Sequence, residues 1–315
     1  MTTKPLGNSG LQVTALGFGA WPIGGTTYGD TSPADGREAL GRYLDLGGRL
    51  IDTARAYRTS ESIIGEVLRS RNMRSEIVLA SKTKANTPEG ILLDLETSLR
   101  ELGTDYLDIY YLHQPPANAG ERDVALAAMS KLQEEGKIRV IGASISGPDV
   151  TAKTEQMCRD YIATGQIGVI QLIFSIFRQG LRSILPLAQE NGVGIVGRTV
   201  LESGFLTGKY TPGTTYPEGD HRNRWTPEQR DRIFESVEQV RAIIGSPAHE
   251  SIDLISTAIR FAMDEPGIDT VILGAKNAHQ SEQTFRIDQF PPLPEPIRQQ
   301  LIETFAGQDA LCNLS

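Results

Sequence analysis

The fold is decided by residues 77–113, which read IVLASKTKANTPEGILLDLETSLRELGTDYLDIYYLH. The segment begins with a short apolar strand pattern at 77–82, and a second pattern of this kind ends it at 107–113. Between them, residues 87–103 have helical apolar spacing, with a Pro near the start and a Gly at the end. This order predicts one strand, one helix and a second strand parallel to the first.

The same strand–helix unit recurs along most of the chain. The polar residues at successive expected strand ends are spaced by 30, 31, 31 and 27 positions, and they are Asp52, Lys82, His113, Ser144 and Gln171. The expected strands are 16–20, 50–54, 77–82, 107–113, 138–144, 168–174, 194–199 and 269–275. Eight such units, without a linker or a shift in composition, predict an α/β fold in which residues 1–315 form a single (β/α)8 TIM-barrel domain.

Two segments depart from the repeat. Residues 200–268 begin with a long loop, rich in Gly and charge, and continue with two helical patterns, so the insertion follows the seventh strand. Loops of this length in a compact domain often carry function. Near the beginning of the chain, residues 4–13 contain an NSG turn between two possible strands, which predicts an N-terminal β-hairpin.

The composition is that of an ordinary globular protein, with 39% hydrophobic and 22% charged residues among 315. The formal net charge of −8 argues against a nucleic-acid partner, because binding to a phosphate backbone needs a cationic surface. The sequence contains neither a signal-peptide pattern nor a stretch approaching the ~20 apolar residues of a membrane span. Its two cysteines, Cys158 and Cys312, predict neither a disulfide framework nor a metal site. We therefore expect a cytoplasmic protein that binds no membrane.

One glycine-rich stretch is misleading. Residues 191–197, NGVGIVG, carry glycines at the spacing of a dinucleotide-binding fingerprint. That fingerprint requires a strand before it and a helix after it, so that the pyrophosphate meets the helix N-terminus. Here a helical pattern precedes the glycines and a strand pattern follows them, which argues against a Rossmann fold.

Four titratable side chains are expected to share one pocket. The carboxyl ends of the strands build the active face of such a barrel, and Asp52, Lys82 and His113 end three consecutive strands. Tyr57 follows Asp52 by five residues, so its loop can fold the phenol over the barrel mouth. A phenol in water loses its proton only near about pH 10, so it needs an adjacent cation to exchange protons at neutral pH. Lys82 can be that cation, with Asp52 as its counter-ion.

His113 can donate a hydrogen bond to a carbonyl oxygen and polarise it. Each residue alone also has a structural interpretation, because Asp often caps turns, Asp–Lys pairs are often ordinary ion pairs and His is often structural. Their joint placement favours chemistry, and a proton donor beside a polarised carbonyl predicts carbonyl reduction. An alternative on the same barrel is a Schiff-base lyase with Lys82 as the nucleophile.

Several motifs in order resemble the aldo-keto reductase family over nearly the whole chain. They are LGNSGLQVTALGFGAW (6–21), IDTARAY (51–57) followed by SE, ASK (80–82), YLH (111–113), RVIGAS (139–144) and GFLTGKY (204–210). The resemblance implies a barrel oxidoreductase that binds a nicotinamide dinucleotide across the strand ends. Hydride then passes between the nicotinamide and a carbonyl carbon.

The resemblance also implies residue roles. Tyr57 matches the general acid and base, Lys82 and Asp52 tune it, and His113 helps to place the carbonyl. The residues implied to bind the dinucleotide are Ala20, Trp21, Asp52, Ser144, Gln171, Arg198, Leu201, Ser203, Gly204, Leu206, Lys209, Gly274, Lys276, Gln280 and Thr284. Lys276 is a candidate partner for a 2′-phosphate, which favours NADP(H) over NAD(H).

The sequence departs from the family pattern at some of these positions. Ile145 stands after Ser144 where Asn is usual, and Arg198 stands where an aromatic ring usually stacks on the nicotinamide. A guanidinium can stack similarly, and its charge favours the reduced, neutral ring. Further differences from the usual Pro, Asn and Gly are Val200, Thr284 and Arg58. These changes keep an alternative function open, that of a dinucleotide-binding accessory or sensing subunit with slow turnover.

The substrate pocket is less clearly marked in the sequence. Trp21 and Trp225 are candidate aromatic walls, beside Tyr57 and His113. The segment GDHRNRW (219–225) brings His221, Arg222 and Arg224 into the long loop, which predicts contacts with an anionic cofactor or substrate. We expect a small carbonyl or alcohol as the partner, such as an aldehyde, ketone or sugar. The oligomeric state stays open.

Overall fold

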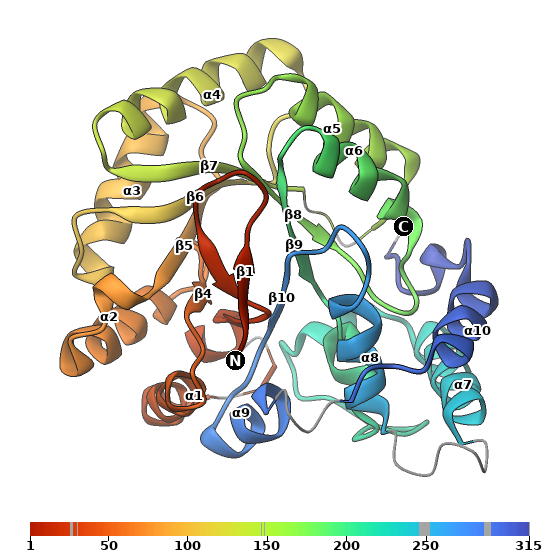
Figure 1. Ribbon diagram of the computed structural model, residues 1–315. Helices are drawn as coiled ribbons and strands as arrows, with labels where there is room; N and C mark the ends of the chain where they lie inside the picture. Colours follow the sequence, from red (N-terminus) through yellow and green to blue (C-terminus); the bar gives the residue numbers. More distant parts are fainter. Residues whose placement is uncertain are drawn as a thin grey trace.

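The computed structural model describes residues 1–25, 28–29, 31–145, 147, 149–245, 253–286 and 291–314. Eight parallel strands close into a barrel in the order β10-β3-β4-β5-β6-β7-β8-β9, which confirms the predicted (β/α)8 fold (Figure 1). The strands are β3 (Leu16–Gly19), β4 (Leu50–Asp52), β5 (Val78–Thr83), β6 (Leu107–His113), β7 (Ile138–Ser144), β8 (Val169–Ile173), β9 (Gly194–Arg198) and β10 (Thr270–Leu273). Each of the eight predicted strands coincides with one of these.

Helices surround the barrel in Figure 1. They are α1 (Pro33–Asp45), α2 (Ser60–Arg71), α3 (Pro88–Leu102), α4 (Ala119–Glu134), α5 (Ala152–Ala163), α6 (Ile184–Glu190), α7 (Pro227–Ile244), α8 (Leu254–Met263), α9 (Ala278–Phe285) and α10 (Glu295–Phe305). Local sequence starts several of them: the side chains of Ser32, Thr87 and Asn118 accept hydrogen bonds from the first turns of α1, α3 and α4. These caps fix where the three helices begin after the loops that precede them.

The predicted N-terminal hairpin is confirmed and closes the amino end of the barrel. It consists of β1 (Thr3–Pro5) and β2 (Gln12–Thr14), which pair antiparallel. Leu6, Leu11 and Val13 are buried and pack in one cluster with the inward side chains of the strands. The barrel interior is thus filled with apolar side chains at this end, which leaves the carboxyl end for chemistry.

The glycines of the 191–197 stretch allow the N-terminal hairpin to pack closely against the barrel. A Cβ added to Gly194 would lie 2.7 Å from Leu6 Cγ, and one added to Gly192 would lie 2.3 Å from the Asn8 side chain. The Asn8 N–H donates to the Gly192 carbonyl oxygen at 2.7 Å. The hairpin therefore reaches the barrel because these positions have no side chain.

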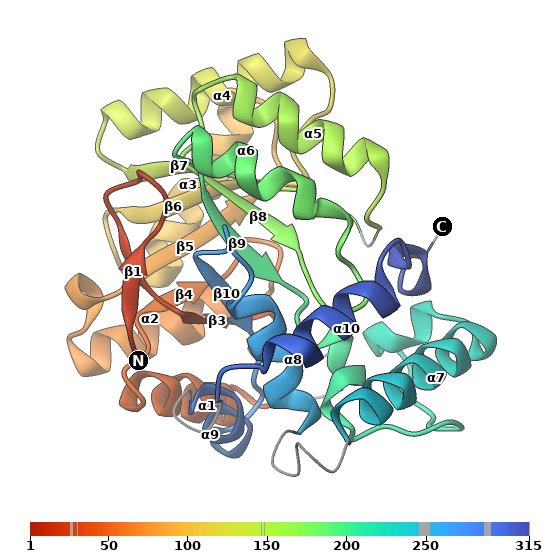
Figure 2. The ribbon, with the colours of Figure 1, turned by 45° about the vertical axis from the view of Figure 1, so that its right-hand side comes forward.

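The long loop after the seventh barrel strand, β9, is confirmed as well. It contains two short 3-10 helices, η4 (Glu202–Thr207) and η5 (His221–Arg224), before α7 and α8. Figure 2 shows α7, which belongs to this insertion, side by side with α10. Within the described residues, no helix has the length and apolar character required to cross a bilayer.

The close approach of the hairpin can be tested by substitution. We expect Gly194→Ala to lower the free energy of unfolding by about 1–3 kcal/mol, because the new methyl group forces Leu6 out of place. Gly120→Ala, in the first turn of α4 and exposed, is the control; its new Cβ meets only the Asn118 side-chain oxygen, at 3.3 Å, and we expect no loss of stability because Ala is favoured over Gly in a helix. Urea denaturation measures both; equal stability of the two variants would contradict this account of the closure.

Candidate active site

The polar residues at the strand ends meet at the carboxyl end of the barrel. Register pairs His113 with Ser144 and Ser144 with Gln171 on neighbouring strands. Asp52 ends β4, and Lys82 lies one residue before the end of β5. Asp52, His113, Ser144 and Gln171 form the floor of a cleft of about 760 Å³, and Lys82 is fully buried next to Asp52. Each residue therefore occupies the position expected from the spacing of the repeat.

A hydrogen-bonded network joins the floor residues. Lys82 is fully buried, and its ammonium donates to an Asp52 carboxylate oxygen and, at 2.7 Å, to the Thr53 carbonyl oxygen. The other oxygen of Asp52 accepts from the Gln171 amide at 2.8 Å. Ser144 donates to the Gln171 side-chain oxygen at 3.3 Å. The buried ammonium is thus matched by a carboxylate that is itself held by a neighbouring strand.

Tyr57 lies directly above this network. The Lys82 ammonium is 5.1 Å from the centre of its ring. The His113 ring stands nearly perpendicular to the phenol, with 5.8 Å between the two centres. The sequence therefore predicted the side chains that meet here: a phenol, a cation with its counter-ion, and an imidazole share one end of the cleft.

The loop that carries Tyr57 is fixed at several points. Its backbone turns tightly, because Tyr57 N–H donates to the Ala54 carbonyl and Ser60 N–H donates to the Tyr57 carbonyl. Glu61 is buried, pairs with Arg55 and accepts from the Ser81 hydroxyl at 2.6 Å. Since Ser81 precedes Lys82, this contact ties the tyrosine loop to the strand that carries the lysine.

His113 is neutral over the physiological range. Burial lowers its pKa to about 3, and the nearby charges of Lys82, Lys84 and Arg198 act in the same direction. Its Nδ1 atom is buried and has no hydrogen-bond partner among the described residues. A neutral imidazole with an unused ring nitrogen can serve a bound ligand as a hydrogen-bond donor or acceptor.

The loop after β9 forms one side of the cleft. Thr199, Glu202 and Ser203 have φ values of 66°, 45° and 55°, a left-handed conformation that is strained for residues other than Gly. Beneath them, the buried guanidinium of Arg178 donates from Nε to Glu202 at 2.9 Å, and Ser175 donates to the same carboxylate. This buried pair holds the strained turn in place.

The other implied cofactor residues fall into two groups. Those that line the cleft are Trp21, Asp52, Ser144, Gln171, Arg198, Leu201, Ser203, Gly204, Lys209, Gly274, Lys276, Gln280 and Thr284. Two do not line it, because Ala20 and Leu206 are fully buried, and their N–H groups donate to the carbonyls of Asp52 and Leu201. These two residues shape the backbone around the cleft.

Of the two tryptophans expected to line the substrate pocket, one lines the cleft and the other does not. Trp21 lines the cleft, stacks on Tyr57 with 6.1 Å between ring centres and meets His221 edge-on at 4.5 Å. Trp225, in contrast, is buried against Phe205, and its indole N–H donates to the Cys312 carbonyl at 3.2 Å. The prediction that Trp225 lines the substrate pocket is therefore wrong, because the C-terminal segment covers it.

The departures from the family pattern have definite places. Ile145 is buried in the core, and its carbonyl accepts from Arg198 at 3.4 Å. Arg198 also donates to Thr199, but its Nε atom is buried and has no partner within the described residues. Val200 and Thr284 line the cleft, whereas Arg58 is exposed and does not.

The cleft contains residues that sequence reasoning did not single out as binding residues. Tyr28 bridges three loops: its hydroxyl donates to Ser203 at 3.4 Å, its carbonyl accepts from Lys276, and its ring lies against His221. Arg178 was also missed. Neither residue ends a predicted strand or sits in a recognisable motif, so the sequence offered no signal for them.

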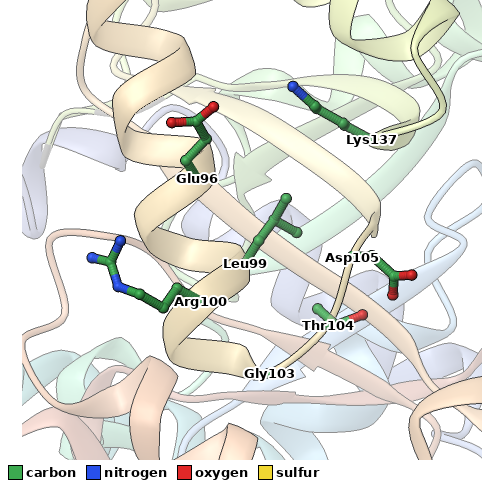
Figure 3. A pocket seen from close by; sticks show the side chains of 7 residues that line it. All are labelled: Glu96, Leu99, Arg100, Gly103, Thr104, Asp105 and Lys137. Atoms are coloured by element: carbon green, nitrogen blue, oxygen red, sulfur yellow. The ribbon is translucent and has the colours of Figure 1, made fainter.

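The cleft is strongly cationic. In the described part of the chain, one carboxylate, Asp52, lines it together with seven cationic residues: Lys84, Arg178, Arg198, Lys209, Arg222, Arg224 and Lys276. A second hollow of about 570 Å³, shown in Figure 3, differs in place and character. It lies near the amino ends of β6 and β7 and mixes acids with bases, among them Glu96, Asp105 and Lys137. The carboxyl-end cleft is thus the candidate site for an anion.

Comparison with known proteins identifies the family. The model of the aldo/keto reductase family matches residues 15–299. The chain belongs to the aldo-keto reductase family. Aldo-keto reductase YhdN of Bacillus subtilis (strain 168) is 31% identical over 298 residues, which cover 90% of this chain and 87% of that protein. The resemblance predicted from the motifs is confirmed, and this aldo-keto reductase is an oxidoreductase of that family.

The chain is also similar to a further curated relative and to a solved structure. The NADH-specific methylglyoxal reductase of Escherichia coli (strain K12) is 27% identical over 307 residues, which cover 89% of this chain and 91% of that protein. The holo form of aldo-keto reductase AKR11C1 from Bacillus halodurans superposes with a TM-score of 0.77 at 24% identity, covering 100% of this chain and 97% of that one. The structural likeness confirms the barrel fold of this aldo-keto reductase.

Two partly buried histidines of the cleft, His113 and His221, predict a dependence of stability on pH. Burial lowers the pKa of both His113 and His221 to about 3, so below about pH 6.5 the unfolded chain takes up protons that the folded chain does not. The free energy of unfolding should fall with decreasing pH between about 6.5 and 3, by up to about 1.4 kcal/mol per pH unit for each histidine.

We expect His113→Asn to reduce this slope, measured by urea denaturation at a series of pH values. His279→Asn, an exposed position on α9, is the matched control and should keep the wild-type slope. An unchanged slope in His113→Asn would show that the pKa of His113 is the same in the folded and the unfolded protein, and would contradict the lowered value.

Proposed function

We propose that this aldo-keto reductase transfers a hydride between NADP(H) and a small carbonyl or alcohol substrate, with Tyr57 as the general acid and base. The observation that carries the proposal is the group of side chains at the end of the cleft. There the phenol lies above the buried Lys82–Asp52 pair and beside a neutral His113.

The donor set of the cleft fits a nicotinamide dinucleotide. Ser144 and Gln171 offer a hydroxyl and an amide at the floor, and Arg198 and His113 each have a buried nitrogen that lacks a partner among the described residues. The strained turn at 199–204 and the cations around it suit a pyrophosphate. When bound, the nicotinamide supplies or accepts the hydride.

The chain's own residues handle the proton. In the reducing direction, the Tyr57 hydroxyl donates its proton to the carbonyl oxygen, and the adjacent Lys82 ammonium stabilises the phenolate that remains. Asp52 is the hydrogen-bonded counter-ion of this buried ammonium. His113, as a neutral imidazole, donates a hydrogen bond that orients the carbonyl oxygen near the phenol.

Two alternatives are less well supported. A Schiff-base lyase would need the Lys82 amine to attack a substrate, but this amine is fully buried and donates to Asp52 and Thr53 below the tyrosine. An accessory or sensing subunit would bind the dinucleotide with slow turnover. The complete set of Asp52, Tyr57, Lys82 and His113 favours catalysis, and steady-state rates distinguish the two functions.

The preference for NADP(H) rests on Lys276. This residue lines the cleft, and its backbone N–H is fixed by Gln280 at 2.9 Å. Its ammonium donates to the Tyr28 carbonyl, which holds it at the cleft wall where a 2′-phosphate can share it. One relative is named as NADH-specific, so the choice of cofactor must be tested in this chain.

We expect Tyr57→Phe to lower kcat for carbonyl reduction by about 100-fold or more, because the variant has no proton to donate. NADPH binding, followed by quenching of protein fluorescence, should stay within about twofold of the wild type because the ring is retained. Wild-type turnover in Tyr57→Phe would refute the acid assignment. Slow turnover in the wild type itself, with tight NADPH binding, would favour the sensing function.

We expect Lys276→Ala to weaken NADPH binding by about tenfold or more, because a charge-assisted contact with the 2′-phosphate is lost. NADH binding should change little, and Lys153→Ala, exposed on α5, is the control. The dissociation constants of both cofactors are measured for the three proteins. If the binding of NADPH and the binding of NADH weaken equally, Lys276 does not contact the 2′-phosphate.

A further inference from the structure

The cations of the cleft lie on opposite sides of its mouth. Lys209 and Arg222 belong to the insertion after β9, the side where the strained turn suits a pyrophosphate. Lys84 belongs to the loop after β5. In the closed order of eight strands, β5 and β9 are four places apart, which puts them across the barrel from each other. Lys84 is therefore remote from the proposed pyrophosphate side.

Lys84 is instead a neighbour of the reacting groups. It follows Lys82 by two residues, and β5 pairs directly with β6, the strand that ends in His113. The charges of Lys84 and Arg198 both lower the pKa of His113, so both cations act at the imidazole. Lys84 is exposed and forms no ion pair with a described residue. Its charge is therefore available at the mouth of the cleft.

A strained residue follows His113 directly in the chain. Gln114, which follows His113, has a φ of 62°, and its backbone N–H donates to the Ser144 carbonyl at 3.3 Å. Its side chain is exposed and lines the cleft. Strain of this kind is retained where the surroundings fix it, often at ligand-binding positions. Because Lys84 and Gln114 follow two paired strands, β5 and β6, and both line the cleft, the Gln114 amide offers a neutral hydrogen-bond donor on the same side of the cleft as Lys84.

From this arrangement we infer that the carbonyl substrate of the proposed reduction carries an anionic group, a carboxylate or a phosphate, that binds at Lys84 and Gln114 while its carbonyl lies at Tyr57 and His113. The inference rests on the proposed function. A neutral carbonyl compound leaves the charge of Lys84 unused, whereas an anion gains a charge-assisted contact there. The net charge of −8 on the whole chain makes this local excess of cations selective.

The inference is tested with two pairs of aldehydes that differ in charge. One pair is 4-carboxybenzaldehyde and its neutral methyl ester, and the other is glyceraldehyde 3-phosphate and glyceraldehyde. For each pair, kcat/KM is measured with saturating NADPH in the wild type, Lys84→Gln, Lys84→Arg and Lys153→Gln. Calorimetric titration with 4-(hydroxymethyl)benzoate and its methyl ester makes the same comparison without turnover.

We expect the wild type to prefer the anion in at least one pair by about tenfold or more, through a lower KM. Lys84→Gln should reduce that ratio about tenfold, Lys84→Arg should retain most of it, and the surface control should leave it unchanged. Added salt should weaken the preference, because it screens an exposed charge.

A ratio near one in both pairs, or one that Lys84→Gln does not change, would overturn the inference and leave the proposed reduction standing. If no aldehyde of either pair is reduced, the proposed function is contradicted for these probes. Calorimetry then decides the inference by itself: tighter binding of the carboxylate that is lost in Lys84→Gln supports an anion site, and equal binding rejects it.

Discussion

The buried ion pair between Lys82 and Asp52 is the constraint on which the active end of the barrel depends. An ammonium that is fully removed from water costs several kcal/mol unless a counter-charge and hydrogen bonds replace its hydration. Asp52 and the Thr53 carbonyl provide both. Because Asp52 also accepts from Gln171, the pair links β4, β5 and β8 across the barrel. The Lys82 ammonium therefore has a fixed position next to the phenol of Tyr57.

A second buried ion pair has a comparable role in the wall of the cleft. Arg178 and Glu202 come from the segments after β8 and β9, and Glu202 itself has a left-handed backbone. Since breaking such a pair leaves an uncompensated charge, the turn at 199–204 has little freedom to relax. The floor and the wall of the cleft are thus organised before a ligand arrives, which reduces the entropy lost on binding.

The sequence predicted the residues whose position follows from the repeat. Asp52, Lys82 and His113 could be placed because each lies at, or one residue before, the end of a strand in a unit of nearly constant length. Trp225 could not be placed in this way, because a tryptophan in a loop can either line a cleft or pack in the core. Its position depends on the path of the C-terminal segment, which the sequence pattern does not show. The same holds for Arg178 and Glu202, which are 24 positions apart, follow successive strands and meet through tertiary structure.

The charge distribution connects the fold to the class of ligand. The chain is acidic overall, yet its carboxyl-end cleft is lined by seven cationic residues and one carboxylate in the part that the structure describes. Walls of low dielectric focus the field of such a cluster, while the acidic exterior repels large polyanions. Two of the cations, Arg178 and Arg222, are matched by Glu202 and Asp220. The cations that remain favour small anions that fit within the cleft. These cations lie on two sides of the cleft, which suits a phosphorylated cofactor on one side and an anionic carbonyl compound on the other side.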